Sequence, residues 1–455
     1  MTRAPKSDSL AEVLVELLAD ISAKSLPDST RDSVARNSLQ VFGVMRLGLQ
    51  NPIGRDSVEY TAKWESGSAA TIVAHGKRSG TCAGAAFANA VAAHSDFRED
   101  THAGSSSHPG VVVIPAVFAV AEAMGGTLPP GRYAEAVVAG HELIGRLGGP
   151  AAERTTARGF RPPSVYTVFG GTLAAALAMG LTQEQQVHAL AIAAQGASGI
   201  THPFLAGSDE WFLAPALAAR HAVMSAMLAA EGVEGSRFAL EGPEGVFVAF
   251  AGETLPVDLR PAGHGGFEIE RARLKAALTC GWNQSLVHQL REFNVRADHV
   301  SAVRVRLSTI AGEYPGVASA GPFPSRSAAL LSAPWAAALQ LVRGSLDHSG
   351  YDDLEDPELL EVARRVDVTP TGDLPGYATE VAIDLTDGTT RFSADGNDNP
   401  AFSLDTRGRV LEALHRNYAS SGLDESRVDV LDAAMTNLLE TGSTANLAAA
   451  IGEAD

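Results

Sequence analysis

The stretch AGAAFANAVAAHSDFREDTHAGSSSHPGVVVIPAVFAVAEAM, residues 83–124, sets a polar segment between two runs of small or apolar residues. The first run, 83–93, is mostly alanine, and the second, 111–124, carries a single charge at Glu122. Both runs are long enough for a helix, and small side chains let helix axes approach closely. The stretch therefore predicts two closely packed helices joined by a segment that is rich in polar side chains.

The helical pattern extends outward from this stretch over residues 8 to about 260. Residues 10–23 repeat apolar side chains at spacings of three and four, which makes one apolar stripe. Thr182, with Gln185 three residues later, forms a capping box that begins a helix. The sequence has no repeat period of the kind that marks a solenoid. We therefore predict a compact bundle, with helices over 10–23, 31–46, 83–97, 111–125, 131–147, 169–180, 183–197 and 213–230.

The pattern changes between about 298 and 397. Residues 303–308 and 381–385 alternate apolar and polar side chains, which is typical of strands with one solvated face. The turn signal of Asp387 and Gly388 then predicts a hairpin, whose second strand contains Phe392. Between the strands, helices are predicted at about 326–343 and 356–365.

Helices are predicted again near the C-terminus, over 405–419 and 424–440. A chain of 455 residues is long enough for two or three domains. We predict a mostly α protein with a large all-helical domain formed by both chain ends, 1–265 and 400–455, and a smaller inserted α+β domain, 266–399.

The charge balance excludes some classes of partner. The chain has 53 Asp and Glu against 35 Lys and Arg, which gives a formal net charge of −18. Proteins that bind nucleic acids or anionic membranes need clustered Lys and Arg, and here these residues are scattered. We predict neither partner. With 45% apolar and 19% charged residues the composition is that of a well-packed globular protein.

The cysteine count and the N-terminus point to a cytoplasmic protein. The two cysteines, Cys82 and Cys280, predict neither a disulfide framework nor a cysteine-based zinc site. The first 20 residues lack a cationic segment followed by a continuous apolar one, so no signal peptide or anchor is expected. The apolar windows 169–181 and 209–229 are interrupted by Gly, Pro or charge, and we predict no membrane span.

The polar segment 94–110 concentrates three histidines and three carboxylates. Such groups beside apolar runs need partners or a ligand, so they either cap helices and pair with one another or form a site. His and Asp also suit metals, but no HExxH or Cys/His spacing supports a metal site, and we predict neither metal nor cofactor. The sequence lacks GxSxG, GxxxxGK[ST] and a strand followed by GxGxxG. Their absence argues against acyl-transfer hydrolases, P-loop enzymes and classical dinucleotide-dependent oxidoreductases.

The chain resembles the MmgE/PrpD family, which includes 2-methylcitrate dehydratase, cis-aconitate decarboxylase and iminodisuccinate epimerase. The similarity covers nearly the whole chain in the right order. It implies a helical domain built from both chain ends, a smaller lid-like α+β domain, a homodimer, and a site between the domains that uses no metal or organic cofactor. The motifs that carry it are HSDFREDTH with HPG (94–110), GHELIGRL (140–147), GFRPPS (159–164), ASGI (197–200), EGPEG (241–245) and the pair Leu274 and Lys275.

The resemblance also implies roles for single residues. His108, in the HPG element, matches the family's active-site histidine and is predicted to be the general acid/base. Asp100 and Thr101 match a DDT element, in which Asp orients a catalytic group and Thr hydrogen-bonds substrate. Lys275 matches a family lysine that either holds a carboxylate or acts as a base. Removal of a proton next to a carboxylate builds negative charge, so such a base needs a stabilising cation nearby.

The departures from the family pattern fall at candidate substrate contacts. Arg161 stands where the family has a histidine, so it keeps a cation but loses a proton donor or acceptor. Trp211 stands at or near a family lysine. Phe97 takes the register of a family aspartate, and Asp96 is shifted by one residue, or about 100° around a helix. Together with His102, we treat Arg161, Asp96 and Trp211 as predicted substrate-binding residues.

These substitutions remove cations and add an aromatic ring. Because a site for a tricarboxylate needs several cations, we predict a substrate with fewer carboxylates and more apolar surface. The leading prediction is a cofactor-independent lyase, a dehydratase that eliminates water next to a carboxylate or carbonyl of a small organic acid. There are three alternatives: an isomerase or epimerase with His108 and Lys275 as its two bases, a decarboxylase, and a catalytically silent binding protein that kept the fold.

Overall fold

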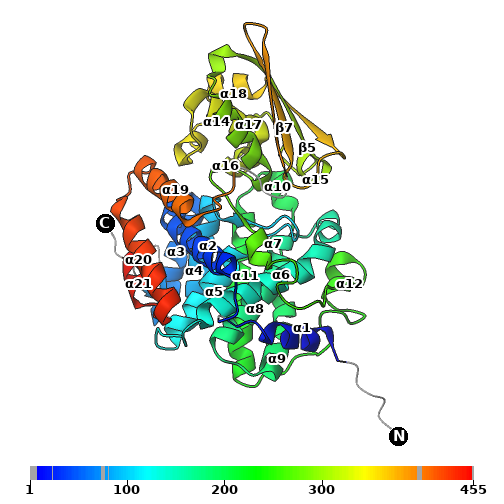
Figure 1. Cartoon of the computed structure of the whole chain (residues 1–455), viewed down its shortest axis with the longest axis vertical. Helices are drawn as coiled ribbons and strands as arrows, with labels where there is room; N and C mark the ends of the chain where they lie inside the picture. The colour runs from blue at the N-terminus through cyan, green and yellow to red at the C-terminus, as the bar shows by residue number, and fades with distance from the viewer. Residues whose placement is uncertain (1–7, 23, 73–76, 80, 397–401, 453–455) are drawn as a thin grey trace.

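The computed structural model describes residues 8–22, 24–72, 77–79, 81–396 and 402–452. A larger helical body, to which both ends of the chain contribute, carries a smaller α+β unit at its top (Figure 1). The predicted fold class, mostly α with an inserted α+β part, is confirmed.

Four apolar helices form the centre of the helical body: α4 (Cys82–Asp96), α5 (Gly110–Ala123), α8 (Thr167–Ala178) and α11 (Leu213–Ala230). Every residue of α4 is buried. Small residues allow the close packing that the sequence predicted: a Cβ atom at Gly170 would lie 2.4 Å from the carbonyl oxygen of Gly140. The other helices of this body are α1 (Leu10–Ala19), α2 (Asp28–Leu47), α3 (Pro52–Trp64), α6 (Arg132–Ala157), α7 (Pro162–Val165), α9 (Gln183–Ala193), α10 (His202–Ala206), α12 (Val246–Ala251), α13 (Glu268–Arg271), α19 (Arg407–Ser420), α20 (Ser426–Thr441) and α21 (Ala445–Gly452).

The α+β unit is built on one four-stranded sheet in the order β6-β5-β7-β8. Strand β5 pairs parallel with β6 and antiparallel with β7, and β7 pairs antiparallel with β8 across the predicted turn at Gly388. Inward-facing residues pair in register, for example Val305 with both Val368 and Val381. The strands are β5 (Val300–Ser308), β6 (Val366–Thr371), β7 (Thr379–Leu385) and β8 (Thr390–Asp395), and the helices of the unit are α14 (Gln284–Phe293), α15 (Thr309–Gly312), α16 (Arg326–Leu331), α17 (Ala333–Arg343) and α18 (Pro357–Ala363).

Several local expectations were wrong. The helix predicted over 326–343 is broken at Ser332, whose side chain accepts a hydrogen bond from Trp335 N and so begins α17 as a new helix. The first 260 residues are not wholly helical, because β1 (Ser66–Ile72) pairs with β2 (Lys77–Ser79). Two short strands, β3 (Asp100–Thr101) and β4 (Arg273–Leu274), also pair with each other.

The buried apolar side chains form two cores, and the division matters for the site. One core contains residues of 11–274 and 404–450, and the other contains residues of 277–385. Four aromatic residues of the helical body, Phe97, Phe204, Trp211 and Phe212, belong to the second core. These rings therefore mark the junction between the two units. The exact domain boundaries at 265 and 400 stay a prediction.

One segment among the described residues, Glu210–Ala230, is long and apolar enough to span a bilayer, with a mean hydropathy of 1.4. This differs from the expectation that the window 209–229 is too interrupted by Gly, Pro or charge to span a membrane. In the structure, 61% of that window is buried inside the protein, as in the core helix of a bundle.

Candidate active site

A cavity of about 70 Å³ lies at the junction of the two units. The helical body contributes the segment after α4, the start of α7 and the residues before α11. The α+β unit contributes residues 280–282, the region of α15, the end of α16 and the segment before β7. The lining residues are mostly aromatic or uncharged: Phe97, Thr101, Ala103, Ser106, His108, Thr156, Arg161, Pro162, Pro163, Thr201, Phe204, Trp211, Cys280, Gly281, Trp282, Ile310, Tyr314, Leu331 and Tyr377.

His108 lies at the cavity wall with its side chain 14% exposed. Its Nδ1 is 2.8 Å from the carbonyl oxygen of Asp100, which can only accept, so Nδ1 carries the hydrogen and Nε2 carries the lone pair. Burial lowers the pKa of His108 well below its ordinary value; Lys275 and His94 add to the lowering and Glu99 opposes it. His108 is therefore a neutral imidazole with a free acceptor atom, which is the form that a general base needs.

Asp100 fixes the segment that carries His108. Both of its carboxylate oxygens accept from the N–H of Gly110 at the start of α5, at 2.9 and 3.1 Å. A Cβ atom at Gly110 would lie 2.8 Å from Asp100 Oδ1, so this close approach requires glycine. Burial is the main reason that the pKa of Asp100 rises to about 7. The side chain of Asp100 is a positioning group, and it does not line the cavity.

Glu99 joins the buried polar groups behind the cavity. Its Oε1 lies 3.0 Å from His94 Nδ1, 3.3 Å from His108 Nδ1 and 3.1 Å from Lys275 Nζ. Arg161 donates to His94 Nε2 at 3.1 Å, so Nδ1 of His94 must carry the hydrogen that points to Glu99. A single carboxylate oxygen therefore orients two imidazoles and pairs with one ammonium.

Phe97 separates Lys275 from the cavity. Its ring lines the cavity, and its centroid lies 4.1 Å from Lys275 Nζ, an arrangement that gives a cation–π contact. Lys275 is fully buried and does not line the cavity, which differs from the expectation that it contacts substrate. Phe97 has φ 63°, a left-handed conformation that costs a bulky residue on the order of 1–3 kcal/mol. Packing against Trp211 and Phe212 holds it there.

Arg161 is the cation of the cavity wall. It is 2% exposed, and its guanidinium lies over the rings of Trp211 and Phe204 at 5.0 and 5.5 Å. It donates to the carbonyl oxygen of Trp211 and to His94, but within the described residues no carboxylate pairs with it. Arg161 Nε and Trp211 Nε1 are both buried donors that have no partner among those residues. Burial lowers the pKa of Arg161 to about 10, so it stays charged at neutral pH.

Two hydroxyl groups meet across the junction. Thr101 Oγ1 and Tyr377 Oη are 2.7 Å apart, and both residues line the cavity. Burial raises the pKa of the Tyr377 phenol, so it stays protonated and can donate. The pair links the end of β3 in the helical body to the start of β7 in the α+β unit.

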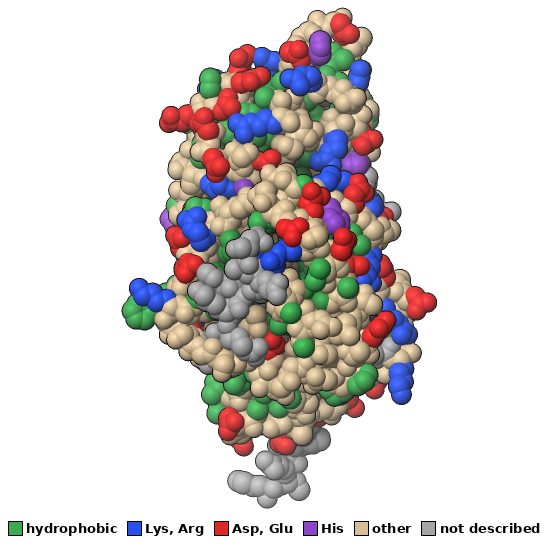
Figure 2. All heavy atoms as spheres, turned by 90° about the vertical axis from the view of Figure 1, so that its left-hand side faces the viewer, with side chains coloured by type: hydrophobic (Ala, Val, Ile, Leu, Met, Phe, Trp, Pro, Cys, Tyr) green, Lys and Arg blue, Asp and Glu red, His purple; other side chains and the backbone are tan. Residues whose placement is uncertain are grey.

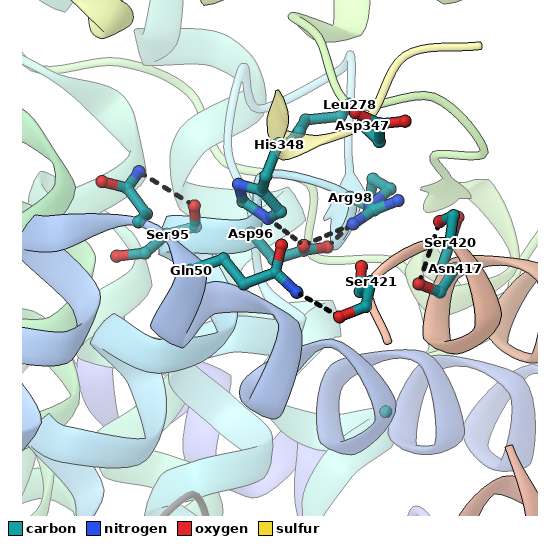
Figure 3. A network of polar contacts seen from close by, with 12 residues as sticks. Gln50, Ser95, Asp96, Arg98, Leu278, Asp347, His348, Asn417, Ser420 and Ser421 are labelled. Carbon is teal, nitrogen blue, oxygen red and sulfur yellow. Dashed lines mark hydrogen bonds and ion pairs between the residues drawn. The ribbon is translucent and has the colours of Figure 1, made fainter. Parts of the chain in front are cut away.

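Asp96 and His102 lie outside the cavity lining, contrary to the prediction that they bind substrate. Asp96 accepts two hydrogen bonds from Arg98, at 2.9 and 2.7 Å, and lies 2.9 Å from His348 Nε2 of the α+β unit (Figure 3). The one-residue shift turned its side chain away, as the helical repeat suggested. His102 Nε2 lies 3.0 Å from Glu268 Oε2 on another face of the segment.

The structure thus brings His108, Thr101, Arg161 and Trp211 to one cavity. It adds residues that the sequence reasoning did not select, chiefly Glu99, His94, Tyr377 and Tyr314. A carboxylate inside a segment between two apolar runs was the available signal for Glu99, and Tyr314 lies close in sequence to the position of a family tyrosine. Tyr377 had no local signal in the sequence. Among the described residues, no three His, Cys, Asp or Glu side chains converge as a metal ion would require.

Comparison with known proteins agrees with the sequence resemblance. Residues 12–257 match the family model described as the MmgE/PrpD N-terminal domain. A cis-aconitate decarboxylase of Aspergillus terreus (strain NIH 2624 / FGSC A1156) is 25% identical over 94% of this chain and 92% of its own length. The cis-aconitate decarboxylases of Mus musculus and Homo sapiens are each 26% identical over 84% of this chain, and cover 81% and 82% of their own lengths.

Proposed function

The chain belongs to the MmgE/PrpD family, and from this premise we propose that it is a cofactor-independent dehydratase that eliminates water from a small β-hydroxy monocarboxylic acid. Family membership and the decarboxylase relatives support a lyase-type enzyme. The elimination of water and the single carboxylate of the substrate are proposed from the residues of the cavity.

One observation carries the proposal: an unpaired buried cation lines the same cavity as a neutral imidazole. Arg161 is the single Lys or Arg, and no Asp or Glu appears, among the described residues that line it. A buried guanidinium without a carboxylate partner is costly, and a substrate carboxylate would relieve that cost. The free donors Arg161 Nε and Trp211 Nε1 offer hydrogen bonds to such a carboxylate.

The proposed first event is proton transfer to His108. Nε2 removes the proton on the carbon next to the carboxylate, and negative charge spreads onto the carboxylate oxygens. Arg161 stabilises that charge from a largely water-excluded position, where electrostatic stabilisation is strongest. Glu99, which lies behind His108, favours the imidazolium that forms.

The leaving hydroxyl needs a proton, and the Thr101 and Tyr377 hydroxyl pair can supply it. The electrons of the broken C–H bond form the double bond while the bond from carbon to the β-hydroxyl breaks. The hydroxyl takes a proton from the pair and departs as water. The product is an α,β-unsaturated acid, and no oxidant or reductant is required.

A decarboxylase is the second candidate, because the relatives at 25–26% identity carry that name. Their named substrate, cis-aconitate, has three carboxylates, whereas a single cation lines this cavity in the part of the chain that the structure describes. An epimerase that uses Lys275 as a second base is less favoured, because the Phe97 ring covers that ammonium.

The test is NMR in deuterated water with 3-hydroxybutanoate, 3-hydroxy-3-phenylpropanoate and cis-aconitate. We expect a hydroxy acid to give an alkene and to take up deuterium on the carbon next to its carboxylate. The variant His108→Gln should lose about 10²–10⁴-fold of this rate, since it lacks the base. Arg161→Met should weaken binding and also lower the rate, because it removes the cation that holds the carboxylate and its developing negative charge.

The matched control is His299→Gln, because the His299 side chain is 69% exposed and does not line the cavity. It should keep the full rate. The proposal fails if cis-aconitate is decarboxylated at an ordinary enzyme rate, or if none of the acids exchanges its α-proton.

A further inference from the structure

The cavity has a second cation close behind its wall. Lys275 Nζ is 3.1 Å from Glu99 Oε1 and 4.1 Å from the centroid of the Phe97 ring. An ammonium group has three N–H donors, and Lys275 Nζ uses one of them for the Glu99 carboxylate.

The Phe97 ring is the barrier between this ammonium and the cavity. Phe97 lines the cavity and Lys275 does not, although Lys275 contacts the ring directly. Phe97 is 3% exposed and packs edge-on against Trp211, with ring centroids 5.2 Å apart. On the cavity side, the Lys275 ammonium therefore faces an aromatic ring.

We infer that Phe97 is a specificity-determining residue that closes a latent carboxylate subsite at Lys275, and so restricts the cavity to acids with one carboxylate. The inference deepens the proposed function and rests on it for the identity of the anion. With the ring in place, only Arg161 offers a charge to the substrate. Without it, Lys275 would offer a second charge across the same cavity.

Charge balance supports this assignment. Glu99 already compensates Lys275, so covering the ammonium leaves no bare buried charge. A second substrate carboxylate in the closed cavity would instead meet an aromatic ring and lose its hydration without compensation. The closed cavity therefore rejects a dicarboxylate by desolvation as well as by space.

Glycine is the informative replacement at this position. Phe97 has φ 63°, which glycine adopts without strain, so Phe97→Gly should keep the backbone while removing the ring. The control is Phe97→Leu, which keeps an apolar cover of similar reach. Thermal melts of both variants show whether each is folded before any ligand is added.

Binding is measured by calorimetry with butanoate and succinate, which share four carbons and differ in one carboxylate. We expect the wild type and Phe97→Leu to prefer butanoate. In Phe97→Gly, the ratio of the two Kd values should shift at least tenfold toward succinate, and the double variant Phe97→Gly with Lys275→Met should lose that shift. An unchanged ratio in Phe97→Gly, or a shift that survives in the double variant, overturns the inference.

A second measurement needs no bound acid. Acetic anhydride should leave Lys275 unmodified in the wild type and in Phe97→Leu, and should acetylate it in folded Phe97→Gly, as peptide mass spectrometry reports. Equal modification of Lys275 in the wild type and Phe97→Gly overturns the inference. If the wild type binds neither acid but Lys275 is acetylated only in Phe97→Gly, the proposed monocarboxylate function is wrong. The role of the Phe97 ring as the cover of Lys275 is then still supported.

Discussion

At the scale of single residues, one oxygen atom organises the chemistry of the site. Glu99 Oε1 contacts His94, His108 and Lys275, and it does so from a fully buried position. Arg161 donates to Nε2 of His94, and the Asp100 carbonyl accepts from Nδ1 of His108, so the hydrogen positions on both rings follow from donor and acceptor rules alone. As a result, Nε2 of His108 carries a lone pair and no hydrogen.

Asp100 gives the first prediction, which concerns pH and stability. Its folded-state pKa of about 7 lies above the unfolded value of 3.8, so the folded protein holds an extra proton between those values. This contribution to stability is fully present at low pH and is lost as the pH rises through about 7. We expect the melting temperature of the wild type, measured relative to Asp100→Asn, to fall by about 2–4 °C from pH 5 to pH 8.

The variant Asp100→Asn keeps an oxygen that can accept from Gly110 N but cannot titrate, so it is the reference for this measurement. Differential scanning calorimetry across the pH range supplies both curves. The exposed substitution Asp367→Asn is the control and should leave the pH dependence of the wild type unchanged. Parallel curves for wild type and Asp100→Asn would contradict the prediction.

At the scale of elements, the ends of helices decide where the site residues lie. Helix α4 ends at Asp96, the left-handed Phe97 reverses the chain, and β3 then carries Asp100 and Thr101 to the cavity. The left-handed residue is why Asp96 and Phe97 point in different directions. Asp96 faces Arg98 and His348, whereas Phe97 faces the cavity.

The element scale also shows what the sequence could predict. Helix α9 begins at the Thr182 capping box, and the β7–β8 hairpin turns at Gly388, because capping and turn signals act over a few residues. The contact of Glu99 with Lys275 joins residues that are 176 positions apart, and no local pattern encodes such a distance. The two-residue strands β3 and β4 are likewise too short to show a period.

The contact between Asp96 and His348 gives a prediction about how the units are held together. Burial would raise the pKa of Asp96, but Arg98 and His348 outweigh it and hold that pKa at about 2, so Asp96 is a carboxylate at neutral pH. His348 donates to it across the junction (Figure 3). We expect His348→Ala to remove about 1–2 kcal/mol of local stability and to speed hydrogen exchange at 348–351 roughly tenfold.

Hydrogen exchange read by mass spectrometry measures this effect peptide by peptide. The control is His299→Ala, which removes an exposed imidazole from the same unit and should leave exchange at 348–351 unchanged. Equal exchange in His348→Ala and the wild type would mean that the contact contributes nothing to holding the units together.

At the scale of the whole molecule, local charge and total charge act in opposite directions. The chain carries a net charge of −18, and acidic and basic side chains are interspersed over the face shown in Figure 2. The long-range field would therefore repel the proposed anionic substrate, and in that proposal its capture depends on Arg161 at short range. The acidic surface favours solubility and says little about the chemistry of the cavity.

The last prediction concerns the expected homodimer, which stays untested. Helix α11 carries an exposed apolar stripe, with Leu217, Met224 and Leu228 exposed by 38%, 42% and 39%. Their spacings of seven and four place them along one side of the helix, while its other sides pack in the core. Single exposed apolar residues are ordinary, but several along one side of a helix, here interrupted by Arg220 and His221, favour a covered surface. We propose that a second copy of the chain covers it.

Light scattering after size exclusion should then give twice the 47.2 kDa mass of the chain for the wild type. The double substitution Met224→Glu and Leu228→Glu keeps helix-forming residues but places charges in the interface, so it should give the single-chain mass with an unchanged helical spectrum. The control is Val430→Glu on α20, which changes a residue that is 54% exposed away from the stripe and should leave the dimer intact. The prediction is wrong if the wild type is a monomer. It is also wrong if the double variant remains a dimer, because the stripe then has no role in assembly.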